Sequence, residues 1–307
     1  MTEQLPERIS LGASDLRVSP LGVGTNAWGR IFQAEPGKQA TFDAILDNGI
    51  NFIDTAEFYQ LGGSERTLGR FLQKSRQAVV VATKFFPFPW RLGKSWLIPA
   101  LRASLRRLGI PQVDLYMLHF PVPPVPLDTW IQALADARET GLTRAVGISN
   151  CGPDQMRRAH AILSGRNLPL ASDQVEYSLL ARRAERTGLL AACHELNVSL
   201  VAYRPLGYGL LTGKYRVEDL PAVLHGRRIT PAYLQRITPL IDLVGALARS
   251  HGKTPSQVAL NWVICQGAIP IPGAKNPAQA AENAGALGWR LETGEVAALD
   301  QASRDFS

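Results

Sequence analysis

Four side chains that can hold a charge or move a proton lie at or just beyond the ends of predicted buried strands: Asp54, Tyr59, Lys84 and His119. Asp54 ends an apolar, β-prone run, and a carboxylate in that position is costly unless it is paired. Lys84 ends the next predicted strand and is the cation that could be buried with it. Tyr59 follows Asp54 by five residues, in a loop that ends at Gly62-Gly63.

These residue types suit acid–base chemistry on an oxygen atom. The pKa of a free tyrosine is about 10, and a nearby ammonium favours the phenolate, so Lys84 is expected to lower the pKa of Tyr59. His119 can donate a hydrogen bond to a substrate oxygen. Taken singly, a strand-end ion pair or a core histidine is an ordinary structural feature. An alternative chemistry is a Schiff base formed on the amine of Lys84.

Alternating strands and helices must position these side chains. Apolar spacing predicts a β-hairpin over residues 8–18, and a long polar segment, residues 207–237, interrupts the later alternation. The predicted strands are 21–25, 50–54, 78–84, 113–119, 143–149, 170–175, 198–203 and 268–271. The predicted helices are 38–48, 64–73 (with Ser64 as its N-cap), 96–108, 128–140, 153–164, 187–196, 239–250, 255–265, 277–286 and 295–302.

Buried strands that alternate with helices require a parallel sheet with right-handed crossovers. Eight strand–helix units in 307 residues favour an α/β fold of the (β/α)8 TIM barrel type, with an N-terminal β-hairpin and a C-terminal extra helix. We expect residues 1–307 to form this barrel as a single domain. The alternative, an open doubly wound sheet, usually carries G-x-G-x-x-G after its first strand. Gly22, Gly24 and Gly29 do not have that spacing.

The polar residues at the strand ends recur at the length of one strand–helix unit. They are separated by steps of 25 to 35 residues, and the series runs Asp54, Lys84, His119, Ser149-Asn150, Gln174 and Tyr203. In a barrel, the carboxyl ends of the strands meet at one rim, where active sites are built. The series therefore predicts one site, and chance is a poor explanation for so many matching residues on one rim.

With these motifs in place, the sequence resembles the aldo-keto reductase family over nearly its whole length. The closest likeness is to the bacterial and chloroplast branch that includes pyridoxal reductases and resembles potassium-channel β subunits. The segments that carry the resemblance are Gly24–Gly29, Phe52–Ala56 with Tyr59, Ser64-Glu65, Ala82–Lys84, Leu118-His119, Gly147–Asn150, Asp173–Ser178, Tyr203–Tyr215 and Ile271–Lys275.

The resemblance implies a catalytic tetrad of Asp54, Tyr59, Lys84 and His119. Tyr59 would protonate a carbonyl oxygen as hydride arrives from a nicotinamide, Lys84 held by Asp54 would tune it, and His119 would orient the carbonyl. The implied activity is NADPH-dependent reduction of an aldehyde or ketone to an alcohol. The alternative is a non-catalytic or slow NADP-binding protein that senses redox state.

The resemblance also implies NADP as the cofactor and a set of contacts for it. Arg204 stands where relatives usually have Ser, and Lys275, at a helix start, favours NADP over NAD through the 2′-phosphate. The implied cofactor-binding residues are Gly24, Thr25, Asp54, Ser149, Asn150, Gln174, Tyr203, Arg204, Pro205, Leu206, Gly207, Leu211, Lys214, Gly273, Ala274, Lys275, Gln279, Glu282 and Asn283.

Aromatic loops beyond the strands suggest an apolar wall for a small carbonyl substrate, although packing of loops onto the barrel competes as an explanation. The expected wall residues are Trp28, Phe58, Phe86, Trp90 and Phe120.

Composition bounds the remaining possibilities. The formal charge is +7, but the basic residues are scattered without interleaved aromatics, so we expect no nucleic-acid partner. A solvated basic surface or attraction of a phosphorylated cofactor explains the charge. Three widely spaced cysteines support neither a disulfide framework nor a metal site. No apolar run is long enough to span a membrane and no signal peptide is evident, so a cytoplasmic protein is expected.

Overall fold

Eight parallel strands form one sheet in the computed structural model, which describes residues 7–29, 36–216, 223–224 and 227–306. Neighbours in the sheet follow chain order, as a barrel requires. The strands are β3 (Gly22–Gly24), β4 (Phe52–Asp54), β5 (Val80–Phe85), β6 (Val113–Leu118), β7 (Thr143–Ser149), β8 (Leu170–Glu176), β9 (Ser199–Tyr203) and β12 (Ile269–Ile271).

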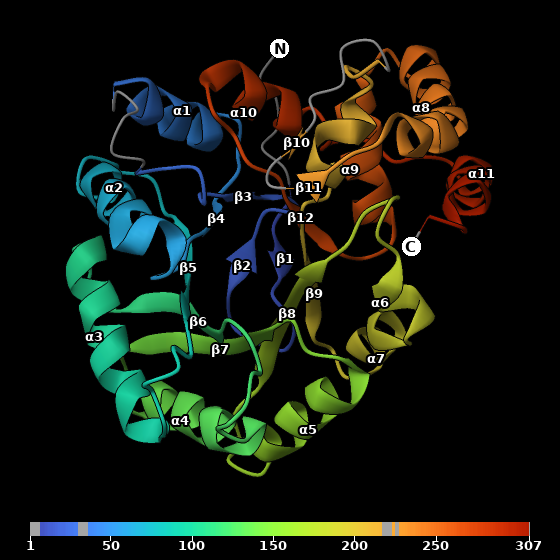
Figure 1. The fold of residues 1–307 in the computed structure, drawn as a ribbon. Helices are drawn as coiled ribbons and strands as arrows, with labels where there is room; N and C mark the ends of the chain where they lie inside the picture. Colours follow the sequence, from blue (N-terminus) through green and yellow to red (C-terminus); the bar gives the residue numbers. More distant parts are fainter. Residues whose placement is uncertain (1–6, 30–35, 217–222, 225–226, 307) are drawn as a thin grey trace.

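The sheet curls until its two edge strands meet. Gly24 forms a parallel bridge with Gly273, and its N–H donates to the carbonyl of Pro272 at 3.0 Å. Figure 1 shows the helices arranged as a ring outside the strands. The predicted (β/α)8 barrel is thus confirmed, while the single domain over residues 1–307 stays a prediction.

The helices follow the predicted alternation with two differences. They are α1 (Pro36–Asp47), α2 (Gly63–Leu72), α3 (Leu97–Leu108), α4 (Leu127–Glu139), α5 (Pro153–Ser164), α6 (Arg183–Arg186), α7 (Leu189–Glu195), α8 (Pro231–Ser250), α9 (Pro255–Cys265), α10 (Pro277–Ala284) and α11 (Thr293–Ser303). The prediction of a single helix over residues 187–196 is wrong at its start, because the structure has a helix before residue 187 and a second one that begins at Leu189. Gly188, at φ +77°, separates the two short helices α6 and α7.

The second difference is the start of α8, expected at Pro239. Thr230 caps this helix by accepting a hydrogen bond from the N–H of Tyr233, and Pro239 lies inside it. The buried side chains of Leu234 and Ile237 extend its apolar face toward the N-terminus. Within the expected polar segment the structure has η3 (Gly207–Thr212) and the antiparallel pair β10 (Val223–Leu224) and β11 (Arg227–Arg228), while residues 217–222 and 225–226 lie outside the described part.

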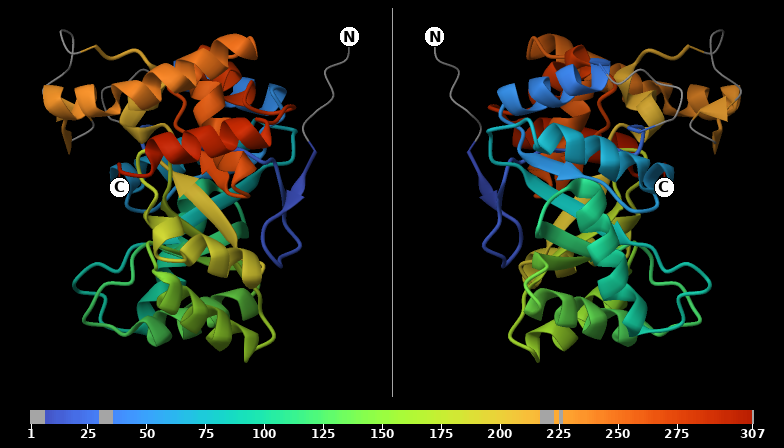
Figure 2. Two further views of the ribbon diagram at one scale, coloured as in Figure 1. Left: turned by 90° about the vertical axis from the view of Figure 1, so that its right-hand side faces the viewer. Right: turned by 90° about the vertical axis from the view of Figure 1, so that its left-hand side faces the viewer.

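The N-terminal hairpin closes one end of the barrel. It consists of β1 (Ile9–Ser10) and β2 (Arg17–Val18), which are antiparallel as predicted. Leu11, Leu16 and Val18 are buried against the side chains that fill the barrel interior. Figure 2 shows the hairpin at the opposite end from the long loops after β5 and β6. The other end is therefore the one left for a site.

Helix α2 packs on the barrel through Ser64 rather than being capped by it. Gly62, in the left-handed region, is the N-cap, and no side chain caps the helix. Ser64 is fully buried, donates to the carbonyl of Thr25 at 2.9 Å and lies 2.8 Å from the hydroxyl of Thr55. The expected capping role of Ser64 is thus wrong, because its hydroxyl joins α2 to the rim segments after β3 and β4.

No helix within the described ranges is long and apolar enough to cross a membrane.

Candidate active site

The buried ion pair expected from the sequence is present at the rim. Lys84 Nζ, at the end of β5, lies 2.6 and 2.8 Å from the two carboxylate oxygens of Asp54 and 2.8 Å from the carbonyl of Thr55. Gln174 donates from Nε2 to Asp54 Oδ1 at 2.8 Å. Burial alone would lower the pKa of Lys84, but the charge of Asp54 and these contacts raise it. The cation is therefore fixed in place and stays protonated.

Tyr59 completes this cluster from the short helix η1 (Tyr59–Gly62). Lys84 Nζ donates to the Tyr59 hydroxyl at 3.2 Å and lies 4.8 Å from the ring centroid. The expectation that the pKa of Tyr59 falls is wrong. Burial raises this pKa above its ordinary value, and the attraction of Lys84 offsets only part of that effect. The resting phenol is therefore protonated.

His119 lies beside Tyr59 with its ring edge-on, at a centroid distance of 5.7 Å. It is buried, and within the described chain its Nδ1 has no hydrogen-bond partner. Burial, assisted by the charge of Lys84, lowers the pKa of His119 to about 2. The imidazole is neutral over the whole physiological range, so it can donate one N–H bond without changing charge.

A second group of polar side chains follows on β7, β8 and β9. Ser149 donates to the carbonyl of Gln174 at 2.7 Å, and Asn150 donates to the carbonyl of His119 at 2.9 Å. The hydroxyl of Tyr203 donates to Asn150 Oδ1 at 2.8 Å. Asn150 adopts φ +61°, which a non-glycine residue rarely does. These hydrogen bonds join Asn150 to His119, 31 residues away, and to Tyr203, 53 residues away, in one polar cluster beside the tetrad.

The loop after β9 is tightly turned and carries cations. Arg204, Gly207, Tyr208 and Gly209 all have positive φ, and the N–H groups of Gly207 and Gly209 donate to the carbonyls of Arg204 and Leu206 at 2.9 Å. The Arg204 side chain is 48% exposed, and its ion pair with Glu176 is long, at 3.5 Å. The other predicted cofactor-binding residues of this loop differ in burial. Pro205, Gly207 and Leu211 are buried, Leu206 is half-buried and Lys214 is exposed.

The segment before α10 places a lysine that the sequence analysis missed. Lys38, on α1, donates from Nζ to the carbonyl of Lys275 at 2.9 Å. Burial and the neighbouring charge of Lys275 lower the pKa of Lys38. An anion bound beside these two positive charges would be attracted by both. The signal was not recoverable from spacing, because 237 residues separate the two lysines.

The remaining predicted contacts cluster around the same seam between β3 and β12. Gln279 Oε1 accepts from the N–H of Lys275 at 2.9 Å, and the side chain of Asn283 donates to the carbonyl of Gly273 at 3.3 Å. Thr25 is fully buried, and its hydroxyl donates to the carbonyl of Asp54. The others here are Gly24, Ala274 and Glu282, of which Ala274 is buried and the other two are partly exposed.

Three of the five expected wall residues, Phe58, Phe86 and Phe120, pack around His119. Phe58 stacks on Phe86 at a centroid distance of 4.3 Å, and Phe120 stacks on His119 at 4.9 Å. Trp90 extends the row by stacking on Phe88 and is 61% exposed.

Trp28 is the exception and corrects the expected wall. It is fully buried, donates from its indole N–H to the carbonyl of Ala274 at 3.1 Å and packs edge-on against Phe42 and Phe71. It belongs to the core between α1 and α2, because its ring turns toward the helices.

An ion pair that the sequence analysis did not identify fixes the aromatic wall. Glu57, buried two residues before Tyr59, accepts from the N–H of Phe86 at 2.7 Å and from both terminal nitrogens of Arg91. Arg91 also donates to the carbonyl of Phe86 at 2.7 Å. Its guanidinium lies 4.7 Å above the ring of Phe85. Glu57 and Arg91 thus clamp the loop after β5 against the segment that carries Tyr59.

Comparisons with known proteins agree with this geometry. The Aldo/keto reductase family profile matches residues 20–304. The chloroplastic pyridoxal reductase of Arabidopsis thaliana is 40% identical over 97% of this chain and 86% of its own length. Among solved structures, the glycerol dehydrogenase of Gluconobacter oxydans has a TM-score of 0.87 at 29% identity, covering 96% of this chain and 94% of its own.

An aldo-keto reductase from Klebsiella pneumoniae, solved in complex with NADPH, has a TM-score of 0.77 at 28% identity and covers 97% of this chain and 95% of its own. The barrel, the buried charged cluster at its rim and these likenesses lead to one conclusion. This chain belongs to the aldo/keto reductase family of NADP-dependent oxidoreductases.

Proposed function

We propose that the chain reduces an aldehyde or ketone to an alcohol, with Tyr59 as the proton donor to the carbonyl oxygen. The observation that carries this proposal is the 3.2 Å contact between Lys84 Nζ and the Tyr59 hydroxyl. Burial keeps the phenol protonated before the reaction. The fixed ammonium stabilises the phenolate left behind when the proton moves, so the charge it favours appears only as the reaction proceeds.

His119 would orient the substrate. Its neutral imidazole can donate a hydrogen bond to the same carbonyl oxygen that Tyr59 protonates, because the two rings lie edge-on at 5.7 Å. Its pKa of about 2 means that it supplies a dipole and not a proton. Two donors would then converge on one oxygen, which is the arrangement that stabilises developing negative charge.

The side chains at the rim fit NADP. Ser149, Asn150 and Gln174 would bind the carboxamide of the nicotinamide, with Tyr203 against its ring. The loop after β9 would bind the pyrophosphate through the exposed cations of Arg204 and Lys214. When bound, the reduced cofactor supplies the hydride.

Lys275, with Lys38 behind it, would bind the 2′-phosphate. These two lysines are the observation that favours NADP over NAD, because a neutral ribose hydroxyl would leave both charges without an anion. Neither lysine has a carboxylate partner among the described residues.

The aromatic wall favours a planar substrate. Phe58, Phe86 and Phe120 present ring faces and edges within stacking distance of His119. A flat aromatic aldehyde would bury its ring there with the carbonyl directed to Tyr59. Pyridoxal, named in the 40%-identical relative, is the first compound of this class to test.

Loss of NADPH absorbance on addition of pyridoxal, and of a panel of aliphatic and aromatic aldehydes, tests the proposal. We expect turnover with NADPH, weaker turnover with NADH, and none without an aldehyde. Tight NADPH binding without turnover of any carbonyl would instead support the redox-sensing alternative. The Schiff-base alternative is disfavoured because Lys84 is held as an ammonium by Asp54 and Thr55. Borohydride trapping without cofactor would revive it.

A further inference from the structure

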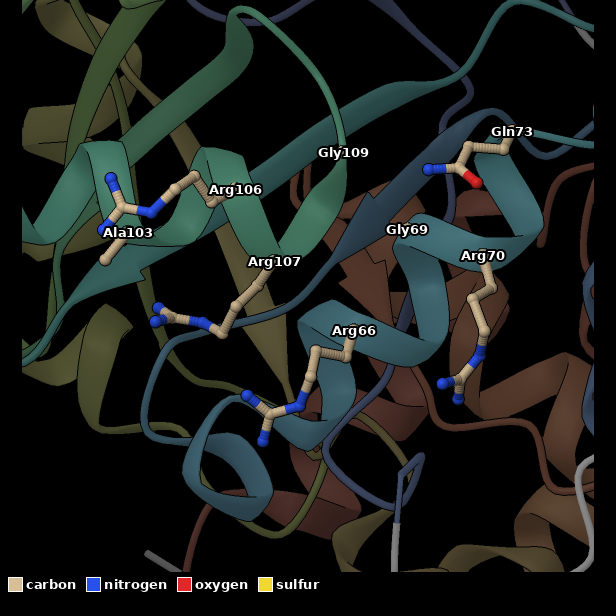
Figure 3. Close-up of a pocket in the computed structure, with 8 residues that line it drawn as sticks. All are labelled: Arg66, Gly69, Arg70, Gln73, Ala103, Arg106, Arg107 and Gly109. Carbon is tan, nitrogen blue, oxygen red and sulfur yellow. The ribbon is translucent and has the colours of Figure 1, made fainter.

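A basic groove runs between α2 and α3, on the outside of the barrel. It is lined by Arg66 and Arg70 from α2 and by Arg106 and Arg107 from α3, with Gln73, Ala103 and the backbone at Gly69 and Gly109 between them. Figure 3 shows arginines from both helices flanking this hollow. Its volume is about 450 Å³, which lies within the range of small-molecule sites.

Close packing of the two helices forms the floor of the groove. A Cβ added at Gly69 would lie 2.6 Å from the carbonyl oxygen of Leu108 and 2.7 Å from that of Arg107. Any larger residue at Gly69 would separate α2 from the end of α3. Glycine therefore lets arginines on two different helices converge.

Two of the charges in the groove, those of Arg66 and Arg106, are not balanced by a carboxylate of the described residues. Glu65 is fully buried and pairs with Arg107 at 2.6 Å, so it neutralises that arginine alone. Within the described chain, Arg66 makes one hydrogen bond, to the carbonyl of Leu61, and Arg106 makes none. Neither is in an ion pair with a described carboxylate. Arg66 and Arg106 thus line the groove without a counter-charge from the described residues.

Helix stabilisation explains only part of this cluster. Arg106 and Arg107 lie in the last turn of α3, where the helix dipole favours cations. Arg66 lies in the opening turn of α2, where the dipole disfavours them. A Cβ added at Gly62, the N-cap of α2, would lie 2.6 Å from Arg107 Cδ and 3.3 Å from Arg66 Nη1. The two side chains therefore come together at a helix start. Because Glu65 neutralises Arg107 there, the remaining charge is that of Arg66, which the helix dipole disfavours and a bound anion would stabilise.

We propose that the α2–α3 groove binds a small, multiply charged phosphate compound of the diphosphate class. Planar guanidinium groups bind phosphate oxygens bidentately, and those on facing helices can contact two phosphate groups at once. A monophosphate would reach fewer of them and bind more weakly. This site is separate from the proposed cofactor site, because none of its lining residues belongs to the rim segments after β7, β9 or β12.

Isothermal titration calorimetry of inorganic pyrophosphate into the full chain saturated with NADP tests the proposal, since the filled cofactor site cannot then account for the signal. We expect one site per chain and an affinity at least about tenfold above that for inorganic phosphate, as one additional charge-assisted contact allows. Adenosine diphosphate is the second probe. If adenosine diphosphate and pyrophosphate bind with equal affinity, the groove recognises the diphosphate alone. If adenosine diphosphate binds more tightly, the groove recognises a nucleotide diphosphate.

The double variant Arg66→Gln/Arg106→Gln should weaken pyrophosphate binding by at least about tenfold. The matched control is Arg102→Gln, which removes the same kind of charge from the exposed surface of α3 outside the groove and should change the affinity by less than about twofold. Thermal unfolding checks that the variants fold. Independently of any variant, pyrophosphate should protect Arg66 and Arg106 from phenylglyoxal in the NADP-loaded protein.

Three results would overturn the proposal: no binding to the NADP-saturated chain, equal weakening in Arg102→Gln, or no protection of the two arginines. Equal weakening would mean that the general positive field of the surface attracts the anion. Because the readout is binding and not turnover, failure here leaves the proposed carbonyl reduction untouched.

Discussion

The charged side chains in the two halves of the rim differ in burial and in pairing. On β4 to β6, the charges of Asp54 and Lys84 are fully buried and satisfy each other through short contacts. After β9 and β12, the cations are exposed: Arg204 contacts Glu176 only at 3.5 Å, and the ammonium of Lys275 forms no ion pair within the described chain.

This difference agrees with what each half would bind in the proposed function. A group that changes charge during a reaction benefits from partners fixed beforehand, because nothing then has to reorganise. A segment that binds a large anionic cofactor benefits from cations left free for it. In the proposed function, the catalytic half is thus complete within the protein, and the cofactor half depends on its ligand. Each variant below tests one side of this comparison.

Lys84→Met should give the largest loss of stability among these variants. It leaves the carboxylate of Asp54 buried with only Gln174 as a donor and should lower the free energy of unfolding by about 3–5 kcal/mol. Reductase activity should fall by more than about 100-fold, since the phenolate loses its stabilising charge. Urea unfolding and steady-state kinetics measure both.

The double variant Lys84→Met/Asp54→Asn separates these two losses. It removes both charges and should recover most of the stability without recovering activity. Recovered activity would show that the ammonium is structural only.

Lys275→Ala tests the cofactor half. It should weaken NADPH binding by about 10- to 100-fold, the value of one charge-assisted contact, and change NADH binding by less than about twofold. Lys38→Met should act in the same direction with a smaller effect. Fluorescence titration measures the affinities, with Lys94→Ala as a control lysine distant from this seam. Equal weakening of NADPH and NADH would remove the 2′-phosphate assignment.

Arg91→Met should loosen the aromatic wall while leaving the tetrad in place. We expect the KM for pyridoxal to rise about tenfold, about 1.4 kcal/mol, with a smaller change in kcat. Arg91→Lys should recover little, because lysine cannot bind Glu57 bidentately. An unchanged KM in Arg91→Met would show that Glu57 fixes the loop through the N–H of Phe86 alone.

The smallest effect concerns Asp173, which is next to Gln174 on β8 but is directed toward the helices. It is fully buried, and neither carboxyl oxygen makes a well-aligned hydrogen bond with a described residue. Burial raises the pKa of Asp173 well above its usual range, although the N–H of Cys151 lies near enough to oppose this slightly. The folded protein thus holds a proton there that the unfolded chain releases.

The resulting pH dependence has a definite sign. A raised pKa contributes stability below the unfolded pKa of about 3.9, and this is lost as the pH rises through the folded pKa. Asp173→Asn should therefore raise the free energy of unfolding by about 1–3 kcal/mol at pH 8 and by less at pH 5. Asp114→Asn should instead destabilise, because Asp114 pairs with Arg144. A loss of stability in Asp173→Asn at both pH values would contradict this account.

The sequence predicted most of the barrel because each strand is a short apolar run followed by a helix-like period, and neighbours in chain order pair in the sheet. The position of the tetrad at one rim was also predictable, since polar residues at strand ends recur once per strand–helix unit. The start of α8 was missed because a proline, usually at a helix start, lies inside this one.

Three features of the site depend on packing that no spacing encodes. Trp28 follows a strand as the other proposed wall residues do, but its ring turns into the core. The pKa of Tyr59 is set by burial against one ammonium, and the sequence shows only the ammonium. Lys38 meets Lys275 because α1 lies against α10, the last helix of the barrel.

Hydride transfer in Tyr59→Phe tests the central claim most directly. Single-turnover oxidation of bound NADPH by pyridoxal should be slower than in the unchanged protein by about 100- to 10,000-fold, the range for loss of a proton donor. NADPH affinity should change by less than about twofold, since the variant removes one hydroxyl from the completed catalytic half. Single-turnover oxidation within about tenfold of the unchanged rate would contradict the assignment of Tyr59 as the proton donor.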